Sequence, residues 1–265
     1  MTFSLLALPL GLLIGVSLGT LGGGGSILTV PALVYALGES PRQATTTSLV
    51  IVGMTALTGT IGHARSRRVR WGPGLVFGVV GVGGSLLGST LNKLVNPNVL
   101  LLAFAGLMLL AAGAMVHRQW SAQRESAQPS APTLVAARGL TVRRVVAIAV
   151  VGTSVGFMTG FFGVGGGFVV VPGLVLALGF RMGEAVGTSL LVIAINSAVA
   201  LAARGGVVAV DWGVVIPFTA TAMAGSLLGN WVAGRVPASA LVRAFAGLLV
   251  LLALYVATRS ILGLV

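Results

Sequence analysis

The chain of 265 residues contains no cysteine and few charged residues of either sign. The absence of cysteine excludes disulfide bonds, thiol nucleophiles and metal sites with cysteine ligands. Only 8% of the residues are charged, whereas a soluble domain carries about 25%. Hydrophobic residues make up 56% of the chain, which excludes a disordered protein, and 40 residues are glycine. This composition predicts an all-α polytopic membrane protein.

Acidic side chains are almost as scarce as cysteine. All four fall in predicted loops or at the ends of apolar segments: Glu39, Glu125, Glu184 and Asp211. Proton and sodium pumps usually hold a carboxylate within the membrane, so a cation-coupled pump has no obvious coupling residue here. Export of an anion from an inside-negative cell is favoured by about 2.3 kcal/mol per charge per 100 mV and needs no coupling.

Histidine is also rare, and His63 and His117 are far apart in the sequence. Because no His/Asp/Glu cluster is visible, we expect no metal, no cofactor and no enzymatic activity. A net charge of +12 would suggest a nucleic-acid partner for a soluble chain. In a membrane protein the basic residues instead mark cytoplasmic loops, and no nucleic-acid partner is expected.

The apolar segments form two sets of five. The first set covers residues 3–21, 26–38, 43–63, 72–92 and 98–116, and the second covers 145–162, 167–180, 185–203, 213–233 and 239–262. Most are near the ~20 residues that span a bilayer. The second segment of each set is shorter and predicts a half-helix or a re-entrant element, so whether it crosses is left open. The polar stretch 118–142 is interpreted as a linker between a first membrane repeat (1–117) and a second (143–265).

The two sets are copies of one another at a constant offset. Pro31 aligns with Pro172, 141 positions later, and 16 of the 35 positions from 15 to 49 are then identical. Chance would give about one in ten, so the chain contains an internal repeat.

Basic residues predict how the two repeats are oriented. One short loop contains Arg65, Arg67, Arg68 and Arg70, and the linker is basic too, so both are expected in the cytoplasm. The repeat partner of that loop contains only Arg204 and Asp211, which fits the outside. We therefore predict two inverted-topology repeats of about five helical segments each, with both termini external and the central linker cytoplasmic.

Each half carries a glycine cluster between its first two segments. The clusters are Gly22, Gly23, Gly24 and Gly25, followed by Ser26, and Gly163, Gly165, Gly166 and Gly167. Each glycine costs a helix up to about 1 kcal/mol relative to alanine, so the helix should break there. The next half-helix begins with free N–H groups and a positive dipole end, which suit a small anion. Inversion would place both N-termini face to face near the midplane, unless the glycines only allow close helix packing.

Hydroxyl groups begin the third segment of each half, at Thr47 and Ser48 and at their partners Thr188 and Ser189. They either donate to a ligand or only cap and pack the helix. Asn196, which aligns with Thr55, either contacts the ligand or bridges helices.

Two further pairs of repeat partners have simpler interpretations. The Gly84/Gly88 and Gly225/Gly229 pairs are expected to pack helices. His63 and Arg204 end corresponding helices, where they either anchor the protein at the interface or attract ions at the mouths of a pathway.

These residues resemble the TauE/SafE sulfite exporter family, also called the toluene-sulfonate uptake permease family. The resemblance rests on the cluster Gly22–Gly25 through Pro31, the cluster Gly163–Gly167 through Pro172, and the element Gly187-Thr188-Ser189-Leu190 with its first-half partner Thr46-Thr47-Ser48-Leu49. It covers both halves except the linker, and the second cluster departs by having Val164 where the first has Gly23. The resemblance implies a transporter of small sulfur-containing anions such as sulfite, sulfoacetate or another organosulfonate.

We therefore predict a multi-pass transporter of the cell (inner) membrane. Export by alternating access between the two repeats is expected, and an anion channel with the same site is the alternative. The lipid bilayer and a small sulfur anion are its expected partners, and a homodimer is one open oligomeric state. The predicted substrate-binding residues are Gly22, Gly23, Gly24, Gly25, Ser26, Thr47, Ser48, Gly163, Gly165, Gly166, Gly167, Thr188, Ser189 and Asn196.

Overall fold

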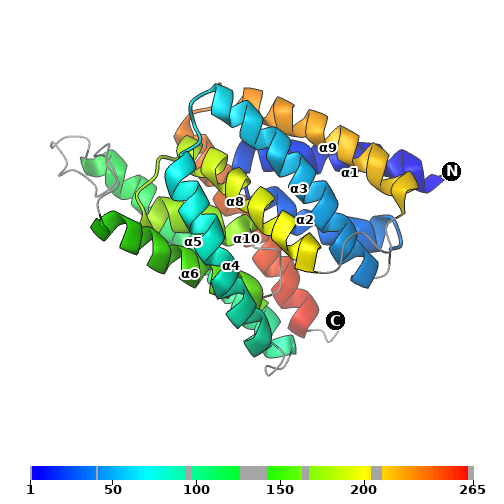
Figure 1. Cartoon of the computed structure of the whole chain (residues 1–265), viewed down its shortest axis with the longest axis horizontal. Helices are drawn as coiled ribbons and strands as arrows, with labels where there is room; N and C mark the ends of the chain where they lie inside the picture. The colour runs from blue at the N-terminus through cyan, green and yellow to red at the C-terminus, as the bar shows by residue number, and fades with distance from the viewer. Residues whose placement is uncertain are drawn as a thin grey trace.

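The computed structural model describes residues 2–39, 41–92, 97–125, 142–162, 167–203 and 211–261, and every element within them is helical (Figure 1). In chain order the elements are α1 (Thr2–Leu21), α2 (Gly24–Pro31), the π-helix η1 (Ala32–Ala36), α3 (Pro41–Arg65), α4 (Trp71–Asn92), α5 (Pro97–Glu125), α6 (Val142–Phe162), α7 (Gly167–Pro172), the π-helix η2 (Gly173–Ala177), α8 (Met182–Ala203), α9 (Trp212–Ala233) and α10 (Ala238–Ile261). The all-helical fold and the positions of the segments predicted from the sequence are confirmed.

Two short half-helices interrupt the series of long helices. In the first, α2 continues directly into η1, and in the second, α7 continues into η2. Each π-helix starts immediately after a proline, Pro31 or Pro172. Proline has no N–H to donate to the preceding turn, which accounts for the local change in helix type. Gly38 and Gly179, with φ of 70° and 71°, then end both half-helices in the left-handed conformation that glycine adopts most easily.

Among the described residues, six helices are long and apolar enough to cross a membrane: Gln43–Arg65, Trp71–Gly88, Leu102–Trp120, Met182–Ala202, Trp212–Ala233 and Ala238–Thr258. Shorter apolar stretches are Ala7–Leu21, Gly24–Val34, Val145–Phe161 and Gly167–Ala177. Long and short stretches fall at corresponding positions of the two halves. The chain is a multi-pass membrane protein.

In two helix pairs, a helix from one half of the chain packs along a helix from the other half. Helix α1 packs along α9, and its repeat partner α6 packs along α4 (Figure 1). In the first pair Gly15 lies against the backbone of Ala222, and in the second Gly156 lies against that of Gly81. These residues correspond at the offset of 141 positions.

The same correspondence extends further along both pairs. Gly19 lies against Ser226 in one and Gly160 against Ser85 in the other. The expected packing role of the Gly84/Gly88 and Gly225/Gly229 pairs is confirmed, because each of these glycines touches the backbone of α6 or α1.

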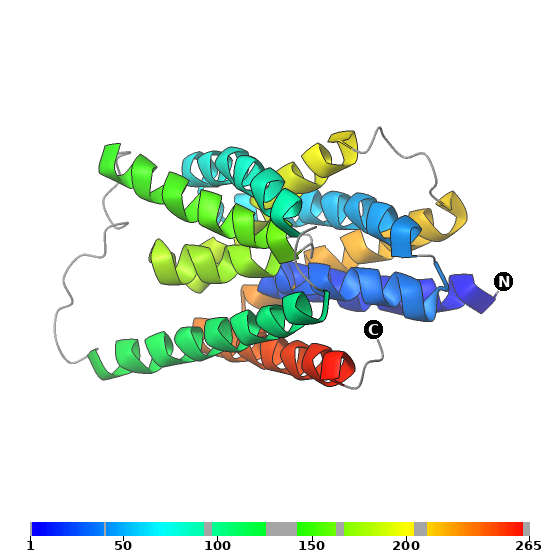
Figure 2. The ribbon, with the colours of Figure 1, turned by 90° about the horizontal axis from the view of Figure 1, so that it is seen from below.

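The centre of the fold is the contact between α3 and α8, which are repeat partners. Gly53 lies against Ser197, and Gly59 lies against Leu190. Because the order of contacts is reversed along α8, the two helices run antiparallel. Helices α5 and α10, also repeat partners, lie side by side along one edge of the molecule (Figure 2).

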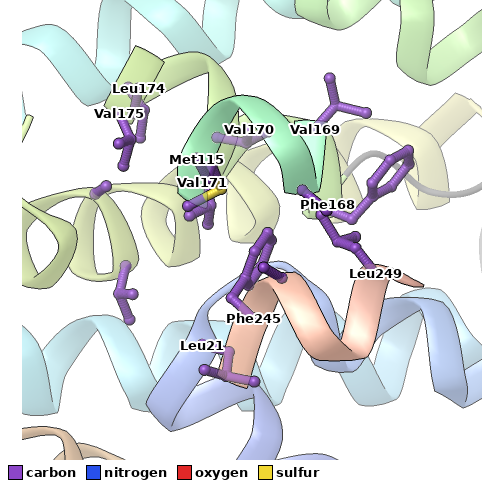
Figure 3. Close-up of a cluster of buried hydrophobic side chains, with 14 of the residues drawn as sticks. Leu21, Met115, Phe168, Val169, Val170, Val171, Leu174, Val175, Phe245 and Leu249 are labelled. Carbon is purple, nitrogen blue, oxygen red and sulfur yellow. The ribbon is translucent and has the colours of Figure 1, made fainter. Parts of the chain in front are cut away.

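Two buried apolar clusters support this arrangement. One joins residues of α1, η1, α3 and α9, including Leu18, Leu33 and Phe218. The larger one surrounds α7 and includes Phe168, Phe245 and Leu249 (Figure 3). The rings of Phe104 on α5 and Phe168 on α7 meet edge to face with centroids 5.0 Å apart. Each cluster therefore combines helices from both halves of the sequence.

The chain begins and ends toward one end of the molecule. Figure 2 shows α1 starting and α10 finishing there, whereas α5 finishes and α6 starts toward the opposite end. Helix α5 also extends through Glu125, so residues 118–125 of the predicted linker are helical. Arg, Gln, Ala and Glu in this stretch are all good helix formers, although they are too polar to have been counted with the apolar segment.

Candidate functional site

The start of each half-helix meets the other in the protein interior. A Cβ atom added to Gly23 would overlap the carbonyl oxygen of Gly167, and one added to Gly167 would overlap the Ser26 hydroxyl. All three residues are buried. Segments that lie more than 140 positions apart in the sequence are thus in backbone contact, and glycine is required for this close approach.

The other glycines of the first cluster are closely packed as well. Gly22 has a φ of 68° and lies against Ser189 and Val171. Gly24 faces the side chains of Leu248 and Phe245, and Gly25 faces α1. Close packing therefore accounts for part of the glycine requirement, as one of the two sequence interpretations expected. Gly163, Gly165 and Gly166 lie outside the described residues.

The electrostatics at the start of α2 favour a negative ligand. Gly23 occupies the N-cap position, where no side chain caps the helix. The first-turn N–H groups of a helix have no intrahelical acceptors and carry the positive end of the dipole. The Ser26 hydroxyl donates to the carbonyl of Gly23 at 2.7 Å, which leaves its own oxygen available as an acceptor only.

A basic residue lies at the far end of the second half-helix. The guanidinium group of Arg118, near the end of α5, donates to the carbonyl oxygen of Val175 in η2. A positive charge is favourable at the C-terminal end of a helix. Arg118 thus stabilises η2 at the end remote from the glycine turn.

The four predicted hydroxyl residues occupy two kinds of environment. Ser48 and Ser189 donate to carbonyls one turn earlier, those of Thr45 and Val186, at 2.9 and 2.8 Å. Thr188 accepts the backbone N–H of Arg70 at 3.1 Å. The Thr47 hydroxyl, which is completely buried, has no hydrogen-bond partner of good geometry.

Two further polar side chains lie on α3 and α8, close in sequence to the contact of Gly53 with Ser197. Thr55 is completely buried, and its hydroxyl has no partner. Asn196 is half-buried, and its side-chain carbonyl is buried without a partner. Buried polar groups are usually satisfied, so this pair offers hydrogen-bonding capacity that the protein itself leaves unused.

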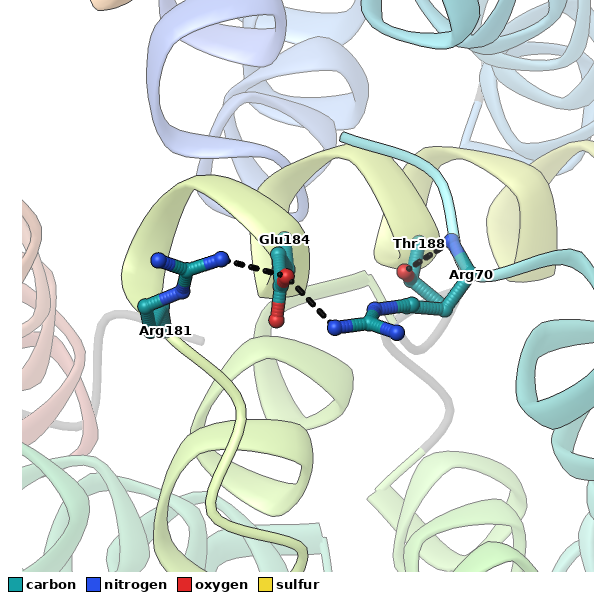
Figure 4. A network of polar contacts seen from close by, with 4 residues as sticks. All are labelled: Arg70, Arg181, Glu184 and Thr188. Atoms are coloured by element: carbon teal, nitrogen blue, oxygen red, sulfur yellow. Dashed lines mark hydrogen bonds and ion pairs between the residues drawn. The ribbon is translucent and has the colours of Figure 1, made fainter. Parts of the chain in front are cut away.

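A polar network holds the loop between α3 and α4 against the start of α8. The guanidinium groups of Arg70 and Arg181 both donate to one oxygen of Glu184, at 2.8 and 3.0 Å (Figure 4). The Arg70 N–H donates to Thr188 in the same network. Sequence reasoning missed these contacts, although an acidic residue at a segment end facing a basic loop is a usable signal.

His63 lies in the last turn of α3, at the helix end where the sequence places it, and its side chain is completely buried by protein. Its Nε2 atom lies 2.9 Å from the carbonyl oxygen of Gly19, and Nδ1 has no partner. The sequence could not predict this burial because the partner of His63 on α1 is 44 positions away. Arg204 lies outside the described residues.

Within the described ranges, no three His, Asp or Glu side chains converge as metal ligands. The described members of the candidate site are Gly22 to Ser26, Thr47, Ser48, Gly167, Thr188, Ser189 and Asn196, and all except Asn196 are buried. The site is therefore enclosed by protein in this conformation.

Known proteins similar to this chain are membrane transporters. The sequence model of the family described as "Sulfite exporter TauE/SafE" matches residues 7–256. A protein of Xylella fastidiosa (strain 9a5c) named "Probable membrane transporter protein" is 34% identical over 256 residues, which cover 96% of this chain and 94% of that protein. The "Probable membrane transporter protein YunE" of Bacillus subtilis is 29% identical, with 74% and 76% of the two chains covered. No solved structure gives a significant match.

Proposed function

Because the chain belongs to the sulfite exporter TauE/SafE family, we propose that this membrane transporter carries small sulfur-containing anions such as sulfite or an organosulfonate. The observation that carries the proposal is the backbone contact between Gly23, at the start of α2, and Gly167, at the start of α7. An anion bound beside this contact would be held by helix N-termini, with no cationic side chain required. The hydroxyls of Ser26 and Ser189 lie against Gly167 and Gly22 in the same region and donate to carbonyls of their own helices, so the donors offered to the anion are backbone N–H groups.

Alternating access is the proposed mechanism, with the membrane repeats in inverted topology. Helices α3 and α8 run antiparallel, and the pair α1·α9 corresponds to the pair α6·α4 of the other repeat. A two-fold axis in the membrane plane would produce both features. The basic loop and linker give the orientation, with the linker in the cytoplasm and both termini outside an inner membrane.

The exchanged contacts also suggest which helices move together. Sequence reasoning expected one repeat to move against the other, but α1 is held against α9 by backbone contacts that a sliding motion would break. We propose instead that α1, α2, α3 and α9 form one body and α4, α6, α7 and α8 form the other. The two bodies then move against each other at the α3·α8 contact, and this motion exposes the anion to one side at a time.

The proposal is tested by ligand-dependent stability of the purified protein. Sulfite or methanesulfonate should raise the melting temperature, because a ligand that binds only the folded state stabilises it. Gly24→Leu should abolish this shift, since its side chain would collide with Leu248 and Phe245 and displace the turn. Gly247→Leu is the matched control, because no atom lies within 4 Å of the position of its Cβ. Normal sulfite binding by a folded Gly24→Leu protein would rule out the site.

Flux measurements separate a transporter from an anion channel with the same site. A transporter in liposomes should show saturation and acceleration of flux by substrate on the opposite side. Single-channel currents would instead support the channel.

A further inference from the structure

His63 is a buried ionisable group that the proposed anion site leaves without a role. Its imidazole is 0% exposed in a helix that is long enough to span the membrane. The Nε2 atom faces the carbonyl oxygen of Gly19 at 2.9 Å. Since a carbonyl only accepts, Nε2 carries a hydrogen, and the neutral ring has its lone pair on Nδ1. That lone pair has no donor.

The position of His63 connects it to both parts of the candidate site. Gly19 lies three residues before the turn that starts at Gly22. On the other side, the Cβ atom of His63 lies 3.0 Å from where a Cβ of Gly187 would be. Gly187 directly precedes Thr188 and Ser189, and Ser189 in turn packs against Gly22. The His63 side chain thus lies between the end of α1 and the part of α8 that packs against the first glycine turn.

Other buried polar atoms lie beside it without partners. The hydroxyl of Ser226 and the side-chain carbonyl of Asn230, one turn apart on α9, are buried and unpaired. The Ser226 hydroxyl faces Gly59 of α3, and the amide nitrogen of Asn230 faces Gly62, directly before His63 in that helix. Three unsatisfied polar atoms in one layer between α1, α3 and α9 indicate a place where protons or water are handled, since buried polar groups are normally paired.

The charged groups around His63 decide when its ring can hold a proton. Helices α1 and α9 contain no ionisable side chain. Arg68 lies five residues after His63 in the chain, and its backbone N–H donates to the carbonyl of His63. Its guanidinium group adds positive charge. Glu184, one turn before Gly187 on α8, is already paired with Arg70 and Arg181. A buried imidazolium therefore needs another negative partner, because an unpaired buried charge is costly.

We propose that His63 is a proton-binding residue of the transporter, whose Nδ1 atom takes up one proton when an anion binds between the glycine turns. The imidazolium balances one negative charge of the anion, and the proton leaves when the anion leaves. This inference rests on the proposed anion site. A purely structural role, in which His63 only caps the end of α1 at Gly19, is the competing explanation.

Linkage gives the first test. If one proton accompanies the anion, the apparent affinity for methanesulfonate should fall about tenfold per pH unit once the free ring is neutral. Methanesulfonate is the probe because its own charge is constant where imidazole titrates, between about pH 5 and 8. His63→Gln, whose amide N–H can still donate to Gly19, should bind with no such dependence. His117→Gln, which changes the exposed second histidine, should behave as the natural protein.

Spectroscopy gives a direct readout of the proton. In His117→Gln the only histidine left is His63, so ¹⁵N-labelled histidine reports on that ring alone. Adding methanesulfonate at constant pH should convert a neutral ring with hydrogen on Nε2 into one protonated at both nitrogens. An unchanged spectrum while the melting temperature rises would overturn the proposal and leave the anion site standing. The absence of any melting shift with sulfite or methanesulfonate would overturn both.

Discussion

The carboxyl group of Glu39 lies in the turn after η1, outside the candidate spans, with neither oxygen in a hydrogen bond of good geometry. Burial raises the pKa of this carboxyl above its usual value, the nearby Thr47 hydroxyl offsets this in part, and the negative charge of Asp211 raises it further. The folded protein therefore binds this proton more tightly than the unfolded chain. It follows that ionised Glu39 destabilises the fold at neutral pH.

We accordingly expect Glu39→Gln to raise the melting temperature at neutral pH. The contribution of Glu39 is fully present below the unfolded pKa and is lost as pH rises through the raised folded pKa. Melting curves from acid to neutral pH should therefore coincide at the acid end and diverge above it, with the variant more stable. A variant less stable than the natural protein at neutral pH would show that the carboxylate is paired.

Thr47 and Thr188 are repeat partners with unequal roles, and substitution by valine separates them. Both are completely buried, but only Thr188 accepts a hydrogen bond, from the Arg70 N–H. Thr188→Val leaves that N–H unpaired and should cost about 1–3 kcal/mol of unfolding free energy. Thr47→Val should cost less in stability and more in the sulfite-induced melting shift. Equal effects of the two variants on both quantities would contradict a ligand role for Thr47.

At the scale of elements, the sequence predicts positions along the chain well and partners poorly. The first glycine cluster predicted the break after Leu21, because a helix does not run smoothly through four glycines, and the short second segments predicted both half-helices. The exchange of α1 and α6 between halves has no local signal, since it depends on backbone contacts made with α9 and α4. The same holds for His63, whose burial depends on Gly19.

The glycines between α4 and α6 give a test of this exchanged packing. A Cβ on Gly156 would overlap the carbonyl oxygen of Gly81, and neither backbone can move alone. Gly156→Ala should therefore lower the free energy of unfolding by about 1–3 kcal/mol, the usual cost of overpacking. Gly83, exposed on α4 with nothing within 4 Å, is the control, and Gly83→Ala should melt at the same temperature or slightly higher. Equal melting of both variants would mean that α4 and α6 are not in contact.

At the scale of the whole molecule, the two repeats share one sequence pattern but carry different charges at the two ends of the helix bundle. Corresponding positions hold Glu39 and Phe180, Thr47 and Thr188, or Asp211 and Arg70. As a result the Arg70–Glu184–Arg181 network joins the α3–α4 loop to α8 at one end, whereas Glu39 and Asp211 place negative charge at the other. The backbone is thus duplicated while the charges at the two ends differ.

The proposed motion of two bodies at the α3·α8 contact can be tested by cross-linking, since the chain has no cysteine of its own. In Gly53→Cys/Ser197→Cys the two Cβ atoms would lie 3.1 Å apart between the bodies, slightly closer than the 3.5–4.5 Å of a relaxed disulfide. In Gly78→Cys/Ile195→Cys they would lie 3.6 Å apart within one body, between α4 and α8. Oxidation of the first pair should stop methanesulfonate flux into liposomes, and a reductant should restore it. The second pair should transport alike in both states. Undiminished flux through the first cross-link would instead favour a pathway that conducts without this motion, as an anion channel does.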